Sequence, residues 1–275
     1  MAKPGAAFLL LACGVGMCAA ERPGMVLIPG GEFVRGRTFK WPDYEVKWYP
    51  NPAKDDEPAR KITIDPIYMD EAEVTNQRYA AFVQATGHRA PYYWREGKIP
   101  IGKEKLPVVN VSWDDASGFC AWDAKRLPTE AEWEHAARGT QEGGMYPWGD
   151  RKITDADAVF NKLDGPAAVC SKTRSASGLC DMIGNVWEWC SDWYGQHYYK
   201  DSPDRNPQGP DSGMYRVIRG GSWFDVPPLF LTLSYRSWAR QRERSPTIGF
   251  RCVLSAPAEV RSPRAVAPPS QTHGR

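Results

Sequence analysis

The chain has 275 residues, of which 42% are hydrophobic and 25% charged, and its formal net charge is +2. These values are ordinary for a soluble globular protein, and the small net charge argues against nucleic acid or a membrane surface as a partner. The unusual feature is the content of 12 tryptophans, 25 glycines and 24 prolines. This mixture predicts much irregular backbone held by large aromatic side chains rather than by long helices.

The first 20 residues predict an export signal. Lys3 precedes a short apolar run, and small residues follow as far as Ala20. This order is typical of a secretory signal peptide, and the run is too short to span a membrane. We therefore expect residues 1–20 to be a signal peptide and the mature protein to be periplasmic. A lipid anchor on Cys13 is an alternative, as is a buried N-terminal helix, although glycine and proline interrupt such a helix.

Strand patterns come first in the mature chain. Residues 25–36 predict two strands joined by a Pro-Gly-Gly turn, and residues 61–75 predict another pair of strands. The polar residues 36–60 between them predict a surface loop.

Three helices are predicted next. The first begins at Thr75 or Asn76, and the second follows Ser112. The third begins after Pro128 and Thr129, and it ends at Gly139. Serine and threonine are favoured caps at a helix start, and glycine is favoured at its end.

Beyond residue 139 almost no helical periodicity remains. Residues 215–223 and 248–254 predict strands, separated by long loops. Residues 256–275 lack apolar periodicity, which predicts a disordered tail. We expect a single domain over residues 21–255.

Five cysteines follow the predicted signal peptide: Cys120, Cys170, Cys180, Cys190 and Cys252. An exported protein can oxidise them, and the odd number leaves at least one unpaired or intermolecular. Their spacing matches no zinc pattern. The four histidines are scattered, so a histidine-rich iron or zinc site is not expected.

Several segments occur together in a characteristic order: MVLIPGGEF, PVVNVSWDDASGFCAW, KRLPTEAEWEHAARG, YPWGD, GLCDMIGNVWEWCSDWY, RVIRGGSW and IGFRCV. On these segments, residues 25–254 resemble the formylglycine-generating (sulfatase-modifying factor) superfamily. That superfamily also includes ergothioneine-synthesis enzymes and PvdO-type siderophore-maturation proteins. The resemblance implies an α+β fold: one compact domain with a C-type-lectin-like core and little regular secondary structure.

The resemblance is incomplete at the copper site of formylglycine generators, where two cysteines follow a Gly-Gly-Ser segment. Gly220, Gly221 and Ser222 match, but Asp225 stands where the first cysteine would fall, and residues 226–240 contain no cysteine. Copper(I) needs soft thiolate ligands. We therefore expect neither copper nor conversion of a sulfatase cysteine to formylglycine. The ergothioneine branch needs an iron-binding helical bundle before this domain, which the residues before 25 could not form.

The family's long-range structural disulfide implies a bridge between Cys120 and Cys252. The family's second bridge has neither end here, because Ala137 and Ser237 occupy its positions. Closing so long a loop stabilises the fold by about 4–5 kcal/mol in the chain-entropy model. Cys170 and Cys180 are close enough in the chain to pair, which the sequence leaves open. Cys190 would then be a buried, inert thiol.

The family's structural calcium site implies a ligand set in the segment DMIGNVWEW. It consists of Asp181, Glu188 and the backbone carbonyls of Gly184 and Val186. Calcium takes carboxylate and carbonyl oxygens of this kind. The alternative is a turn without metal, in which Glu188 forms a salt bridge.

Without copper cysteines, other side chains near the Gly-Gly-Ser segment must carry any chemistry. Glu243 is our first candidate for a proton acceptor, because flanking arginines would keep it ionised. Asp225 is second, and Ser222 completes the catalytic set. The candidate substrate-binding residues are Trp223, Tyr235, Arg236, Trp238 and Arg240. The alternatives are a solvated charged loop around Glu243 and tryptophans that belong to the core.

The resemblance implies an exported PvdO-like oxidoreductase that matures a peptide siderophore of the pyoverdine type. The reaction would oxidise a dihydroxyquinoline-type precursor, whose flat phenolic ring suits tryptophan faces and arginines. The sequence identifies neither the oxidant nor a redox cofactor. A non-catalytic ligand- or protein-binding module of the same fold is one alternative. A regulatory partner in an envelope or secretion system is another.

Overall fold

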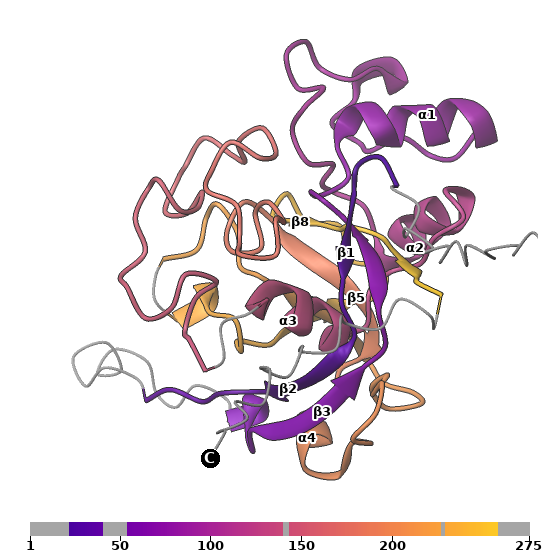
Figure 1. Cartoon of the computed structure of the whole chain (residues 1–275). Helices are drawn as coiled ribbons and strands as arrows, with labels where there is room; N and C mark the ends of the chain where they lie inside the picture. Colours follow the sequence, from indigo (N-terminus) through magenta and orange to yellow (C-terminus); the bar gives the residue numbers. More distant parts are fainter. Residues whose placement is uncertain (1–21, 41–53, 140–142, 227–228, 258–275) are drawn as a thin grey trace, which may run out of the picture.

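The computed structural model describes residues 22–40, 54–139, 143–226 and 229–257 (Figure 1). The predicted signal peptide, with Cys13, lies outside these ranges, as does the predicted tail from residue 258. Within the described ranges, no helix is long and apolar enough to cross a membrane.

The strands form three small sheets, with orders β1-β4-β9, β2-β3 and β7-β6-β5-β8. All neighbours are antiparallel except β5 and β8, which run parallel. The bounds are β1 Met25–Ile28, β2 Gly31–Arg35, β3 Arg60–Ile64, β4 Ile67–Asp70, β5 Trp187–Trp193, β6 Tyr215–Arg219, β7 Ser237–Arg240, β8 Ile248–Gly249 and β9 Val253–Ser255.

The helices are short and are closed by local caps. Their bounds are α1 Asn76–Thr86, α2 Trp113–Trp122, α3 Glu130–Arg138 and α4 Tyr198–Asp201, with 3₁₀ turns η1 Lys54–Asp56, η2 Arg95–Gly97 and η3 Leu229–Leu231. The Thr75 hydroxyl accepts a hydrogen bond from the backbone of α1. Ser112 and Thr129 form capping boxes with acidic residues three positions later. The predicted starts of all three helices are confirmed, and α3 ends at Gly139 as predicted.

The C-terminal strand prediction was wrong in part. Residues 248–254 do not form one strand beside residues 219–223. They divide into β8, which pairs with β5, and β9, which pairs with β4. The side chains of Phe250, Arg251 and Cys252 between them are buried, so this link crosses the core as irregular backbone.

Helix α3 lies at the centre of the molecule, where it packs on β2, β3, β5 and β6 (Figure 1). Trp133 of α3 and Trp189 of β5 are both fully buried. The structure is therefore one mixed domain in which sheet edges and loops surround a central helix. The expected α+β class with little regular structure is confirmed.

Two disulfides tie this domain together. Cys120 of α2 and Cys252 are joined across 132 residues, with Cα atoms 5.6 Å apart, which confirms the bridge that the resemblance implied. Cys170 and Cys180 are also joined, which decides the pairing that the sequence left open. Among the described cysteines, Cys190 remains as a buried thiol whose pKa is raised well above its usual value by burial.

Candidate functional site

The Gly-Gly-Ser segment follows β6 and turns sharply. Gly220 and Gly221 have φ values of 97° and 77°, a conformation that side chains rarely adopt. A Cβ on Gly221 would lie 2.4 Å from a methyl carbon of Leu231, and one on Gly220 would lie 3.2 Å from the Trp133 ring. Both glycines are thus required by packing against the protein's own core.

The turn places Ser222 and Asp225 in direct contact. One carboxylate oxygen of Asp225 accepts hydrogen bonds from the Ser222 backbone at 2.8 Å and from the Ser222 hydroxyl at 2.7 Å. Asp225 also accepts a hydrogen bond from the side chain of Trp187, the first residue of β5. Burial raises the pKa of Asp225, although these hydrogen bonds oppose the rise. The result is a partly buried, oriented carboxylate.

Apolar side chains are exposed on both sides of Asp225. The backbone of Asn161 donates to the Asp225 carbonyl at 2.9 Å, so residues 161–163 lie against this turn. Leu163 is 89% exposed, Phe224 57% and Val226 56%. An oriented carboxylate therefore lies beside an apolar surface, which is an arrangement suited to a ligand with an apolar or aromatic group.

Two further candidates lie close to this carboxylate. The ring of Tyr235 contacts Trp187 with centroids 6.1 Å apart, and it contacts Phe230 at 5.2 Å. The indole of Trp223 donates to the carbonyl of Pro246 at 3.2 Å, which ties the turn to the loop before β8. The structure thus brings Ser222, Trp223, Asp225 and Tyr235 together.

Glu243 occupies a different setting from the one that we expected. It lies in an exposed turn after β7, where its carboxylate accepts from the Arg240 backbone at 3.3 Å and its own backbone donates to the Arg240 carbonyl at 2.8 Å. Of the neighbouring arginines, Arg244 pairs with Asp115 of α2. The turn is therefore a surface loop, in agreement with the alternative interpretation.

The remaining substrate-binding candidates divide between surface and interior. Trp238 of β7 is 41% exposed and stacks on Tyr194, with ring centroids 4.6 Å apart. Arg236 is 1% exposed, and its guanidinium makes two hydrogen bonds to Glu130, at 2.7 and 2.9 Å. The structure therefore separates Arg236, which belongs to the interior, from Trp238 and Arg240 on the surface.

Arg236 is part of a buried charge network that we did not predict. Arg219 donates to Glu134 at 2.9 Å and to Glu130 at 3.3 Å, and Arg138 donates to Glu134 at 2.7 Å. Burial alone would raise the pKa of both glutamates, but the arginines outweigh it and lower both values. The signal in the sequence was the presence of arginines within apolar strands, as in RVIRGG.

The carboxylates of the predicted calcium segment are both occupied by protein donors. Both oxygens of Glu188 face the guanidinium of Arg251, at 2.6 and 2.7 Å, and one of them also accepts from the Trp133 indole at 2.8 Å. Asp181 accepts from the Cys170 backbone at 2.7 Å. The salt bridge that we considered as the alternative is thus present.

Glu73 is a third carboxylate at this place, and the sequence gave no indication of it. It is 1% exposed and accepts from the Asn185 side chain at 2.7 Å and from the Val186 backbone at 3.2 Å. Burial raises its pKa, and the charges of Asp181 and Glu188 raise it further.

The charges of this group do not balance. Three carboxylates, those of Glu73, Asp181 and Glu188, lie around the guanidinium of Arg251, and Arg174, which acts on Asp181 as well, is itself paired with Glu71. Glu188 Oε1 accepts one hydrogen bond among the described residues, from Arg251, so this oxygen can accept a further contact. The oxygens of these three carboxylates do not all lie within 4.8 Å of one another, so a hard cation here would also need backbone carbonyls as ligands.

In the described part of the chain, one group of metal-binding residue types has its ligand atoms within 4.8 Å of one another, and it is formed by Glu71, Cys170 and Cys180. Its two sulfurs form the second disulfide and so offer no thiolate.

Comparison with known proteins gives a consistent result. Residues 16–256 match the model of the sulfatase-modifying factor enzyme 1-like domain. The chain is 36% identical to a formylglycine-generating enzyme from Streptomyces coelicolor, over 86% of this chain and 92% of that protein. It is also 37% identical to the serine/threonine-protein kinase pkn1 of Chlamydia pneumoniae, where the match covers 83% of this chain but only 37% of the kinase.

Among solved structures, PvdO from Pseudomonas aeruginosa has the same fold. It superimposes with a TM-score of 0.69 and 26% sequence identity, and the match covers 85% of this chain and 99% of PvdO.

Proposed function

The chain belongs to the sulfatase-modifying factor enzyme 1-like family, and we propose that within it the protein is an exported, PvdO-like oxidoreductase acting on a peptide siderophore precursor of the pyoverdine type. The observation that carries the proposal is the oriented carboxylate of Asp225 beside an exposed apolar surface. The two disulfides support export to an oxidising compartment such as the periplasm.

Asp225 is the better proton acceptor of the two carboxylates that we considered. Its pKa is raised by burial, so it is more basic than an ordinary aspartate, and Ser222 fixes its orientation. General base catalysis needs both properties. Glu243 lies in an exposed turn and has no comparable setting. We therefore reverse the order in which the sequence ranked them.

In the proposed reaction, a dihydro ring of the precursor becomes aromatic by losing two hydrogens. Asp225 accepts one as a proton from the phenolic ring. The resulting anion passes two electrons to dioxygen in one-electron steps. The second hydrogen of the ring is transferred to the reduced oxygen as a proton, which yields the hydroperoxide anion. Asp225 then returns its proton to that anion, so the products are the aromatic ring and hydrogen peroxide. The base contributes about 10²–10⁴-fold to such a step. Copper takes no part, because no thiol stands at position 225.

Calcium completes the proposal as a structural ion. Asp181, Glu188 and the carbonyls of Gly184 and Val186 would hold it, next to Glu73. When bound, the ion would neutralise buried negative charge and so fix the segment that carries Trp187, the side chain that donates to Asp225.

The experiment incubates the purified protein with a reduced, non-fluorescent siderophore precursor in air and follows fluorescence and hydrogen peroxide. We expect Asp225→Asn to lose at least about 100-fold in rate, whereas Glu243→Gln keeps the wild-type rate. Both variants should unfold at the wild-type temperature. A wild-type protein that binds the precursor without accelerating its oxidation would overturn the oxidoreductase proposal. Equal rates for wild type and Asp225→Asn would show that Asp225 is not the proton acceptor.

A non-catalytic binding module is the second candidate. The exposed side chains of Leu163, Phe224 and Val226 favour it, because they offer contact area without requiring any chemistry. Binding of the precursor without turnover, weakened by Phe224→Ser, would be its signature.

A further inference from the structure

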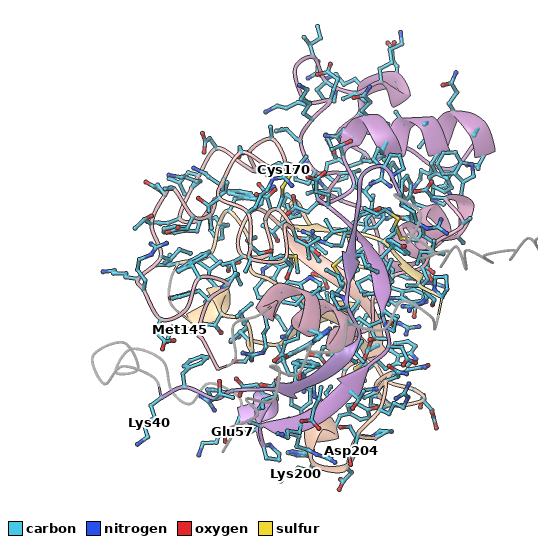
Figure 2. All side chains as sticks on the ribbon, viewed as in Figure 1. Lys40, Glu57, Met145, Cys170, Lys200 and Asp204 are labelled. Carbon is cyan, nitrogen blue, oxygen red and sulfur yellow. A yellow bond between two sulfur atoms is a disulfide. The ribbon has the colours of Figure 1, made fainter. Side chains whose placement is uncertain are left out.

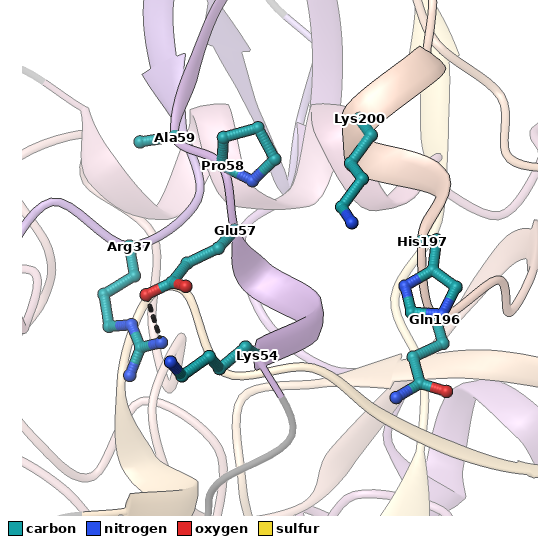
Figure 3. A pocket seen from close by; sticks show the side chains of 8 residues that line it. All are labelled: Arg37, Lys54, Glu57, Pro58, Ala59, Gln196, His197 and Lys200. Carbon is teal, nitrogen blue, oxygen red and sulfur yellow. Dashed lines mark hydrogen bonds and ion pairs between the residues drawn. The ribbon is translucent and has the colours of Figure 1, made fainter.

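A cavity of about 750 Å³ is lined by residues that have not been discussed so far. Figure 3 shows the side chains that line it, and none of the predicted site residues is among them. Figure 2 places two of these residues, Glu57 and Lys200, at the end of the molecule opposite Cys170. The full lining is Arg37, Lys54, Glu57, Pro58, Ala59, Gln196, His197 and Lys200.

The cavity has two walls that come from distant parts of the chain. One wall is formed by residue 37 and residues 54–59, and the other by residues 196–200 around α4 (Figure 3). Arg60 holds the walls together, because one of its nitrogens donates to the carbonyls of Tyr199, Lys200 and Ser202, at 3.3, 2.9 and 2.9 Å. The spacing of the two walls is therefore fixed before any ligand binds.

Arg37 is also held in place within the first wall. The backbone of Arg37 donates to the carbonyl of Asp56 at 3.0 Å, and its guanidinium binds Glu57 at 2.6 Å and lies 3.4 Å from the Asp56 carboxylate. The Arg37 side chain is only 8% exposed. These contacts offset the charge of Arg37 within the protein and hold this wall of the cavity in place.

The described lining carries more positive than negative charge. Arg37, Lys54 and Lys200 are cations, and Glu57 is the one carboxylate among the described lining residues. That carboxylate is engaged by Arg37. The lining thus has a formal charge of +2, with His197 and Gln196 as further hydrogen-bond donors. The two lysines come from opposite walls: the Lys200 ammonium points into the space between the walls, and Lys54 extends along its own wall toward Arg37 (Figure 3).

We propose that this cavity binds a polyvalent oxyanion, a ligand with at least two phosphate or carboxylate groups that engage both walls at once. Lysine, arginine and histidine donors are the groups that recognise oxyanions, and charge-assisted hydrogen bonds are the strong ones. The volume suits a small organic molecule rather than a single ion. A ligand with a single anionic group can bind only one wall. We therefore expect the cavity to bind anions with two or more such groups more tightly.

The test is calorimetric titration of the whole protein with tripolyphosphate, citrate and acetate at matched ionic strength. We expect one site for a polyvalent anion and none for acetate. In the double variant Lys54→Gln/Lys200→Gln, affinity should fall by about tenfold or more. The matched control is Lys98→Gln/Lys103→Gln, which removes two exposed lysines elsewhere and changes the net charge equally. It should bind as the wild type does.

The outcomes separate the possible ligands. Saturable binding of tripolyphosphate but not citrate assigns a phosphate ligand, and the reverse assigns a carboxylate ligand; both support the proposal. Binding that weakens equally in the two double variants would reflect net charge alone and would overturn it. Acetate binding as tight as that of the polyvalent anions would also overturn it, as would no binding of any anion by a folded wild-type protein.

Discussion

The interior network around α3 and the cavity beside α4 use charged side chains in opposite ways. In the network, Glu130 and Glu134 are each bound by two arginines, and these side chains are almost fully buried. In the cavity, Lys54 and Lys200 come from opposite walls, and the one carboxylate among the described lining residues, Glu57, is already bound by Arg37. Charges with partners inside the chain hold the fold together. Charges that lack such partners are available to a ligand.

The predicted calcium segment lies between these extremes. It is buried like the network, but its charges do not balance, since Glu73, Asp181 and Glu188 lie around the guanidinium of Arg251. Buried charge without compensation is costly. This region should therefore depend on an added cation for stability, which the network does not.

The largest effect is expected in the network. Arg219→Met removes the guanidinium that joins Glu130 to Glu134 and leaves buried negative charge without its partner. We expect the free energy of unfolding to fall by about 3–5 kcal/mol, measured by urea denaturation. Arg205→Met, which breaks an exposed pair with Asp65, is the control and should cost less than about 1 kcal/mol. Equal costs for the two variants would contradict the comparison.

Calcium removal should also lower the stability of the fold. A ligand that binds only the folded state at 100 times its Kd stabilises it by about 2.7 kcal/mol. Chelation should therefore lower the melting temperature of the wild type, and added calcium should restore it. In Asp181→Asn this dependence should be lost, whereas Asp155→Asn, at an exposed carboxylate, should keep it. A wild type whose melting temperature ignores both chelator and calcium would refute the site.

A pH effect should reveal the carboxylate at the edge of the network. Burial raises the pKa of Asp192 from 3.8 to about 7, although it accepts from the Glu130 backbone at 2.9 Å. The folded protein thus keeps this proton to higher pH than the unfolded chain does. Its contribution to stability is present at low pH and is lost as pH rises between about 4 and 7.

The measurement compares unfolding free energies of wild type and Asp192→Asn across that range. We expect the wild type to lose up to about 4 kcal/mol relative to the variant as pH rises, because each pKa unit is worth about 1.4 kcal/mol and the asparagine does not titrate. Parallel curves for the two proteins would show that Asp192 has no such role.

The smallest effect on stability should come from the cavity. Lys54→Gln/Lys200→Gln should change the unfolding free energy by less than about 0.5 kcal/mol, as should the control Lys98→Gln/Lys103→Gln. Thermal and urea denaturation without added anion provide the measurement. A loss of several kcal/mol in the first variant would mean that these lysines have structural partners, and the contrast between network and cavity would fail.

What could be predicted from the sequence was mainly local. The capping residues Thr75, Ser112 and Thr129 predict three helix starts, and the structure has all three. Sheet partners depend on residues far apart in the chain, so the division of residues 248–254 between two sheets could not be predicted. Strand β5 was overlooked because its buried run, WEWCSDW, lacks the alternation of a half-exposed strand.

The site was predictable only where a motif fixed it. Ser222 and Asp225 were identified by their position in the Gly-Gly-Ser segment, and they do lie together. Glu243 was chosen because of flanking arginines, but sequence neighbours in a turn need not face one another, and Arg244 turns to Asp115. Glu73 has no motif of its own, and only the folded chain brings it to Asp181.

Strands β1 and β9 both flank β4, and this has a consequence for how the domain can be combined with others. β1 begins opposite Asp70 at one end of β4, and β9 ends opposite Ile67 at the other. From strand spacing and rise, the points where the chain enters and leaves this sheet are roughly 14 Å apart. A gap of that size can be closed by a short linker, so the whole unit can be inserted into a loop of a host protein or circularly permuted without separating its halves.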